Sequence, residues 1–168
     1  MYDPRLDTLA DLLIKHSIHL QHGEKILIET FDIPEDMVIA LIRAARNVGG
    51  VPLISYKQNR IQRELIQAGQ EEAMQIIGEC ETYRMERVQA YIGMRGSRNV
   101  AELSDVSAAA MEFYERHWVQ PVHFQVRVPK TKWVVLRWPS ASMAQQAKMS
   151  TDSFEDFYFD VCTLNYGK

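Results

Sequence analysis

Short apolar runs alternate with amphipathic segments along the chain, and this alternation constrains the fold more than any other feature. Residues 25–29 (KILIE) and 51–55 (VPLIS) are short and largely apolar, as expected of buried strands. Between and after them, apolar residues recur at spacings of three and four, which is typical of one helix face. The rhythm predicts βαβ units, and therefore an α/β fold with a mostly parallel sheet and helices on both faces. We expect four strands, at residues 25–30, 51–56, 88–94 and 133–138, in the spatial order 2-1-3-4.

The helical segments follow from the same spacing. Apolar residues from Leu6 to Leu20 predict a first helix that ends at Gly23. Asp32 is expected to cap the second helix, because Glu35 follows it three residues later. Further helices are expected at 58–68, 70–87 and 106–117, and two more near the end, split at 149–150. The predicted inward faces are Ala73, Ile76, Ile77 and Cys80 in the 70–87 helix, and Phe154, Phe157, Tyr158, Val161 and Cys162 in the last.

Two prolines predict an interruption before the fourth strand. Pro121 and Pro129 lack the backbone N–H that a helix interior needs. We therefore expect a connector between the 106–117 helix and the fourth strand.

Size, composition and charge fit one globular domain covering residues 1–168. The apolar fraction is 46% and the net charge is -3, and a nucleic-acid-binding surface would be basic instead. The sequence has no apolar run long enough to span a bilayer and no basic signal-peptide start. We therefore expect a cytoplasmic protein without nucleic-acid or membrane partners. Its two cysteines, Cys80 and Cys162, are expected to be buried free thiols.

Three histidines, His16, His19 and His22, are spaced three residues apart and raise the question of a metal site. Histidine is the commonest metal ligand among side chains, but a metal-binding helix usually places ligands at i and i+4. His16 and His22 would lie about 120° apart on a helix. We expect surface and helix-end residues here and assign no metal ligand.

For the other titratable residues, the sequence context favours structural roles over catalytic ones. We expect His117 to be a core or helix-end residue with one hydrogen bond, whereas His123, in the connector, has no informative neighbours. Gly93-Met94-Arg95-Gly96 is a weak candidate for anion binding through backbone N–H groups, helped by Arg95 and Arg98. The acidic residues near the end of the chain alternate with aromatic ones and predict a solvated helix face: Asp152, Glu155, Asp156 and Asp160.

The carboxyl ends of the strands are the best place for a ligand, because parallel α/β sheets bind ligands at that edge. The residues expected there form a mixed, polar rim that could bind a small molecule or face a partner domain. They are Glu29, Thr30, Asp32, Tyr56, Lys57, Arg95–Asn99, Trp138, Pro139 and Ser140.

The last third of the chain carries a pattern of a known family. Its segments are Trp138-Pro139-Ser140, Met143-Ala144-Gln145, Lys148-Met149-Ser150 and Phe154-Glu155-Asp156-Phe157-Tyr158. They resemble the thermophilic-type metalloaminopeptidases, which have aromatic-Pro-Thr, an Ala-Gln helix, Gly-Met-Ser and an acidic-aromatic helix. Ser140 replaces the family's threonine, and Lys148 replaces its glycine.

The front of the chain agrees with this resemblance, which extends over the whole sequence. The matching segments are Tyr2–Arg5, the leucine-rich first helix, Gly23–Ile28, Arg95–Asn99 and Glu102–Val106.

The resemblance implies an enzyme that removes N-terminal amino acids from peptides with two divalent metal ions, of zinc, cobalt or manganese. Family members are about twice as long, and their metal ligands lie in the C-terminal half. No residue of this sequence matches a ligand. We therefore expect an N-terminal domain, isolated as a fragment from its C-terminal metal-binding domain, that walls the substrate cleft, is inactive alone and forms a homo-oligomer, such as a dimer.

Two other functions stay open. A free-standing α/β ligand-binding module would bind a small molecule alone, in a pocket lined by Tyr56, Arg95 and Trp138. An interaction subunit would pair with a separately encoded catalytic half. A severed domain would instead leave an apolar patch exposed, which we expect around the last helix and the rim.

Overall fold

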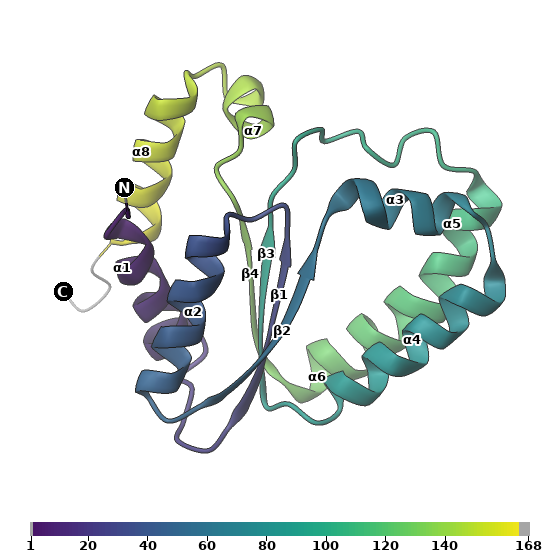
Figure 1. The fold of residues 1–168 in the computed structure, drawn as a ribbon, viewed down its shortest axis with the longest axis horizontal. Coiled ribbons are helices and arrows are strands. Elements are labelled where there is room, and N and C mark those ends of the chain that lie inside the picture. The colour runs from purple at the N-terminus through teal and green to yellow at the C-terminus, as the bar shows by residue number, and fades with distance from the viewer. Residues whose placement is uncertain (1, 165–168) are drawn as a thin grey trace.

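Four parallel strands form one sheet between two helical layers in the computed structural model, which describes residues 2–164 (Figure 1). The strands are β1 (Lys25–Phe31), β2 (Val51–Lys57), β3 (Ala90–Arg95) and β4 (Lys132–Arg137). Their spatial order is β2-β1-β3-β4, and every neighbouring pair is parallel. The predicted fold class, strand positions and strand order are therefore confirmed.

The two central strands explain why the sheet forms where the sequence places it. Ile26, Leu27 and Ile28 of β1 and Tyr91 and Ile92 of β3 are almost completely buried. Strands covered on both faces are continuous apolar runs, as the sequence shows here. The edge strands are less buried, and β4 alternates between exposed and half-buried residues.

Each face of the sheet has its own helices and its own apolar core (Figure 1). The first layer contains α1 (Arg5–Leu12), its π-helical extension η1 (Leu13–Ser17), α2 (Glu35–Asn47) and α8 (Thr151–Cys162). The second contains α3 (Asn59–Gln67), α4 (Glu71–Met85), α5 (Ala108–Tyr114), the π-helical segment η2 (Glu115–Arg127) and α6 (Val128–Lys130). A short helix, α7 (Ala141–Gln146), follows β4. None of the helices in the described part of the chain is long and apolar enough to cross a membrane.

The prediction of a connector before β4 is wrong, because this part of the chain is helical: α5, η2 and α6 follow one another without a break. Pro121 lies inside η2. The wide π-helical turns accommodate the missing N–H, and the stripe of Trp118, Val122 and Val126 packs into the second core. Burial of this stripe outweighs the local preference of proline to end a helix.

Close packing of η2 against α4 depends on Gly78. A Cβ atom at this position would lie 1.8 Å from the carbonyl oxygen of His117. Only glycine therefore allows the two backbones to approach this closely.

The ends of two predicted helices differ from the expectation. The first helix ends at Ser17 rather than Gly23, and His19 lies beyond it with a φ of 44°. Asp32 does not cap α2; its carboxylate accepts a 2.6 Å hydrogen bond from Asn59 Nδ2 and so holds the start of α3 instead. A φ of 49° turns Asp32 away from α2.

Two helices, α4 and α8, bury a face that differs from the predicted one. In α4 the buried residues are Met74, Gly78, Glu81 and Met85, whereas Ile76 and Cys80 are exposed. In α8 the buried aromatic residues are Tyr158 and Phe159, and Phe157 is exposed. Both cysteines are free, as expected, but Cys80 is exposed and Cys162 only half-buried. Aromatic contacts of Phe159 with Trp138 and the guanidinium of Arg5 decide the orientation of α8.

Lys148 occupies a backbone conformation that suits glycine. Its φ is 57°, in the left-handed region, at the turn between α7 and α8. The family pattern has glycine here, so the lysine is the one departure that introduces backbone strain. Ser150 caps α8, because its side chain accepts the N–H of Ser153 at 3.2 Å.

Candidate functional site

The carboxyl end of the sheet brings together a buried cluster of charged residues. Glu29 of β1 pairs in register with Gly93 of β3, so Arg95 lies two residues further along the neighbouring strand. Arg95 Nη2 lies 2.8 Å from Glu29 Oε1, and Lys57 Nζ at the end of β2 lies 2.8 Å from Glu29 Oε2. Three strand ends therefore meet at one carboxylate, as the rim prediction required.

Tyr91 completes the part of the cluster that comes from the sheet. Its hydroxyl donates a 2.7 Å hydrogen bond to Glu29 Oε1 and accepts one of 2.6 Å from Arg95. Gly93, between them on β3, leaves room for both side chains, since a Cβ there would lie 2.8 Å from the Tyr91 hydroxyl. The backbone N–H of Gly96 is bonded to the carbonyl of Phe31. The role of these glycines is therefore steric rather than the anion binding considered above.

Two helices of the second layer add charges that sequence reasoning missed. Arg127, in η2, lies 3.5 Å from Glu29 Oε1 and stacks over the Tyr91 ring at 3.8 Å. Glu81, in α4, lies 3.1 Å from Lys57 Nζ. The sequence places neither residue at this site, because it predicts a connector between the 106–117 helix and β4 and a different buried face for α4. The usable signals were the spacing of Trp118, Val122 and Val126, and the acid Glu29 inside an otherwise apolar strand.

Opposite charges decide the protonation of Glu29. Burial by itself raises the pKa of this carboxyl group, but the charges of Lys57, Arg95 and Arg127 outweigh burial and hold its pKa well below its usual range. Burial and the Glu29 charge together raise the pKa of Tyr91. The carboxylate is therefore ionised and the tyrosine is a neutral donor.

His123 lies beside the cluster, where it is held neutral. Burial lowers its pKa, and the charges of Arg127 and Arg95 lower it further. Its Nδ1 atom is 3.2 Å from Arg127 Nη1, so the neutral ring accepts a hydrogen bond from the guanidinium. Sequence analysis could not assign a neighbour to His123, because the helix that brings it here was not predicted.

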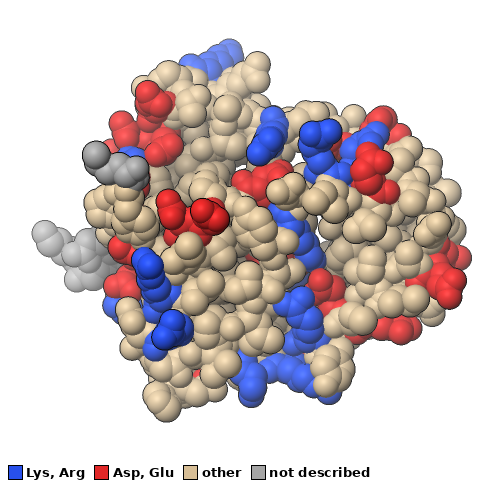
Figure 2. Space-filling view, in the orientation of Figure 1, with Lys and Arg blue, Asp and Glu red and all other residues tan. Residues whose placement is uncertain are grey.

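A pocket of about 130 Å³ opens onto this cluster. Aromatic side chains form part of its wall, and Lys57 Nζ lies 4.7 Å from the ring centre of Trp118. Figure 2 shows basic side chains along the boundary between the sheet and helices α3 to α5, where this face of the molecule is hollowed. We call the pocket and its charged residues Glu29, Lys57, Arg95 and Arg127 the strand-end pocket.

The other rim residues do not line the strand-end pocket. The Tyr56 hydroxyl donates a 2.8 Å hydrogen bond to the carbonyl oxygen of Ile33, in the segment between β1 and α2. Trp138 packs against Tyr158 and Phe159 on the opposite face, and Arg98 is exposed. The prediction that Tyr56, Arg95 and Trp138 line one ligand pocket is therefore wrong.

Other rim residues, Thr30 and Ser140, have structural roles. Thr30 is buried in β1, and Ser140 Oγ lies 2.9 Å from Ser142 Oγ at the start of α7. Ser142 in turn bonds to the Ser97 carbonyl, which ties α7 to the loop after β3.

The terminal acids face solvent, as expected, and two of them hold Arg5. Glu155 Oε1 and Asp156 Oδ1 lie 2.9 and 2.7 Å from its guanidinium, whereas Asp152 and Asp160 are simply exposed. These acids join α8 to α1 and have no access to the strand-end pocket.

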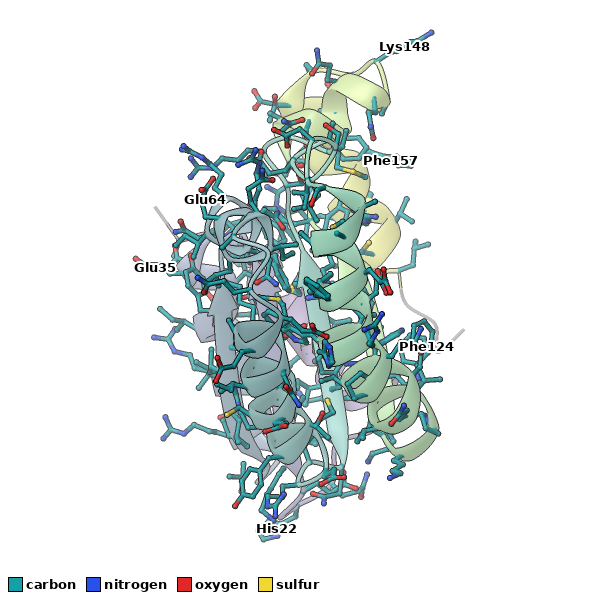
Figure 3. All side chains as sticks on the ribbon, turned by 90° about the vertical axis from the view of Figure 1, so that its right-hand side faces the viewer. His22, Glu35, Glu64, Phe124, Lys148 and Phe157 are labelled. Carbon is teal, nitrogen blue, oxygen red and sulfur yellow. The ribbon has the colours of Figure 1, made fainter. Side chains whose placement is uncertain are left out.

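The three early histidines lie at the other end of the sheet. Figure 3 shows His22 at the end of the molecule opposite Lys148, at the amino edge where β1 begins. The His22 ring covers Gly49, and His16 is exposed at the end of η1. Within residues 2–164, no group of three or more His, Cys, Asp or Glu side chains could hold a metal ion, so these residues do not fit the implied metals.

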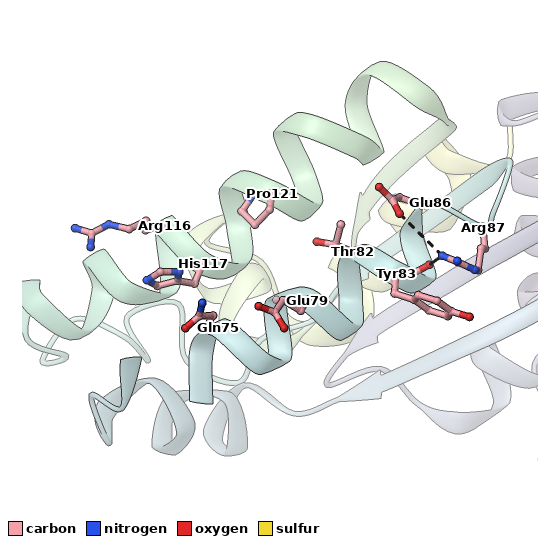
Figure 4. Close-up of a pocket in the computed structure, with 10 residues that line it drawn as sticks. Gln75, Glu79, Thr82, Tyr83, Glu86, Arg87, Arg116, His117 and Pro121 are labelled. Atoms are coloured by element: carbon pink, nitrogen blue, oxygen red, sulfur yellow. Dashed lines mark hydrogen bonds and ion pairs between the residues drawn. The ribbon is translucent and has the colours of Figure 1, made fainter. Parts of the chain in front are cut away.

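A larger pocket, of about 420 Å³, lies in the open groove between α4 and η2 (Figure 4). His117 contributes to it from η2, and its Nε2 atom lies 2.8 Å from Glu71 Oε1. This single hydrogen bond agrees with the structural role predicted for His117. The groove holds mostly exposed side chains, so it offers less for chemistry than the strand-end pocket.

Comparison with known proteins assigns the family. The thermophilic metalloprotease (M29) family matches residues 2–167. The chain belongs to this family. No curated protein sequence matches it. Membership of the M29 family confirms the resemblance inferred from the sequence motifs.

The solved structure of AmpT agrees with the fold described above. AmpT from Thermus thermophilus has a TM-score of 0.72 and 14% sequence identity with this M29 chain, over 97% of this chain and 43% of AmpT. The chain therefore spans less than half the length of that structure. A LacI-family transcription regulation repressor from Corynebacterium glutamicum has a TM-score of 0.33 and 11% identity, over 79% of this chain and 60% of that one.

Proposed function

We propose that residues 1–168 form the N-terminal domain of a two-domain, metal-dependent aminopeptidase and contribute one wall of its substrate cleft. The observation that carries this proposal is the M29 family match over residues 2–167. The 43% coverage of AmpT supports a further domain beyond these residues. Because residues 2–164 do not fit a metal, we assign the two divalent metal ions, and the hydrolytic chemistry, to that other domain.

The carboxyl edge of the sheet is the surface that we assign to the cleft. Ligands of parallel α/β sheets bind at this edge, and here it carries exposed polar residues such as Arg98. Substrates in this proposal are peptides with a free N-terminus.

Exposed apolar side chains support contact with a second domain or a second copy. Phe157 and Val161 on α8, and Trp133 and Val135 on β4, are each at least 40% exposed. Exposed apolar side chains that lie together often mark a surface that another domain or subunit covers. We therefore include a homodimer in the proposal. The free cysteines suit a reducing compartment, so the proposed location is the cytoplasm.

The cleft assignment is tested in a polypeptide of family length that carries residues 1–168 at its start. Arg98→Ala, at the carboxyl edge, should change KM for a leucyl tripeptide while kcat stays within about twofold, because binding but not chemistry is affected. Arg46→Ala is the matched control, since Arg46 is also exposed but lies at the amino edge, at the end of α2. Equal KM values for both variants and the unchanged enzyme would contradict the assignment.

A small-ligand-binding module is the second candidate function. The observation that favours it is the strand-end pocket, which lies entirely within this chain. Binding there would not require another domain.

A further inference from the structure

We infer that the strand-end pocket binds one small oxyanion, a carboxylate or phosphate group, through Arg127 and Gln62. Neither the family nor the proposed cleft requires such a site. Anion binding would stand even if the aminopeptidase proposal failed, because every residue involved belongs to this chain.

The first support is a surplus of positive charge. Lys57, Arg95 and Arg127 surround Glu29, and Glu81 is the second acid in contact with them. Three cations therefore face two carboxylates. His123 is held neutral by burial and by its cationic neighbours, so it does not change the balance.

The second support is a pair of buried donors without partners. The Nε atom of Arg127 and the Nε2 atom of Gln62 are buried, and neither has a hydrogen-bond partner among the described residues. Arg127 and Gln62 are only 7% and 8% exposed. A buried donor left unpaired costs about 1–3 kcal/mol, and such groups call for a bound molecule or another specific explanation.

Both side chains line the same pocket, although they come from different elements. Gln62 extends from α3, and Arg127 from the end of η2. In this proposal, one ligand between the two helices accepts hydrogen bonds from both unpaired N–H groups. A guanidinium and an amide N–H together suit an acceptor with two or more oxygens.

The size of the pocket limits the ligand to a single small group. Pockets for drug-sized ligands are about 300–1,000 Å³. The strand-end pocket is about 130 Å³, which suits one carboxylate or phosphate group but not a peptide. Phe31 and Trp118 in its wall lower the local dielectric constant and strengthen the attraction to an anion.

Calorimetric titration of the 168-residue chain with sodium acetate, leucine or sodium phosphate tests the site, with chloride used to match ionic strength. We expect saturable binding of at least one of these anions and a rise in thermal midpoint at the same concentrations. Binding of acetate and leucine but not phosphate would identify a carboxylate as the ligand, and the reverse result would identify phosphate.

Matched variants separate the site from general charge effects. Arg127→Gln should weaken binding at least about tenfold, whereas Arg116→Gln, an exposed arginine of the same helix, should leave it unchanged. Gln62→Leu removes an unpaired donor while keeping similar size, so it should raise the thermal midpoint of the free chain and weaken anion binding. Absence of saturable binding by the unchanged chain, or equal affinity of the folded Gln62→Leu chain, would overturn the inference.

Discussion

Glu29 Oε1 and Arg95 Nη2 lie 2.8 Å apart across the two central strands, and the Glu29 side chain is only 6% exposed. The same carboxylate also faces Lys57 and Arg127, so one acid compensates several buried cations. Glu29 therefore holds together three strands and a helix at the edge where ligands of such folds bind.

Glu29→Gln should destabilise the chain strongly, because it leaves cations uncompensated in a buried site. Removing one partner of a buried ion pair typically costs about 3–5 kcal/mol. Urea unfolding followed by circular dichroism measures the change. Glu155→Gln is the control, since it breaks a half-exposed pair with Arg5 and should cost less than about 1 kcal/mol. Equal losses from the two variants would show that Glu29 has no special structural role.

The neutral state of His123 should make stability depend on pH. Its pKa is lowered in the folded chain, so the unfolded chain binds more protons as the pH falls through the usual histidine value of about 6.5. The free energy of unfolding should therefore decrease between pH 7.5 and 5.5. Thermal unfolding of His123→Asn over this range should show a shallower decrease than the unchanged chain. An identical pH dependence would mean that the ring does not titrate as its surroundings indicate.

The strain at Lys148 should be relieved by the residue that the family pattern has there. Lys148→Gly removes the cost of a left-handed conformation, about 1–2 kcal/mol, against a smaller gain in unfolded-state entropy. We expect a net stabilisation of up to about 1 kcal/mol in chemical unfolding. Lys148→Ala keeps a Cβ atom and should bring no such gain. Stabilisation by alanine as large as by glycine would assign the effect to the side chain instead.

The histidines near the N-terminus should not create a tight metal site. His19 has left the helix and His22 lies over Gly49, so the three rings do not share one helix face. Calorimetric titration of the chain with zinc or cobalt at neutral pH should give no stoichiometric site of micromolar affinity. A site of that kind, lost in His16→Ala or His19→Ala, would refute this prediction.

The fold could be predicted because its central strands have a clear pattern. Ile26, Leu27 and Ile28 are buried on both faces, and the parallel βαβ rule then leaves few arrangements of the remaining strands. The helix through Pro121 could not be predicted, since proline normally ends a helix and only the packing of Trp118 and its neighbours reverses that preference.

The candidate site was predicted only in part. Glu29, Lys57 and Arg95 could be placed together because parallel strands end at the same edge. Arg127 and Glu81 come from helices, and their positions depend on how those helices are rotated against the sheet. Local spacing does not determine that rotation when exposed apolar residues such as Ile76 compete for the buried face.

Turnover of leucyl-p-nitroanilide shows whether these residues form a non-catalytic domain of a metal-dependent aminopeptidase, as we propose. The 168-residue chain and a polypeptide of family length that begins with it should be assayed side by side, each with added zinc, cobalt or manganese. We expect turnover by the longer polypeptide and none above background by residues 1–168. Comparable rates from the two would contradict the proposal and place the catalytic residues within this chain.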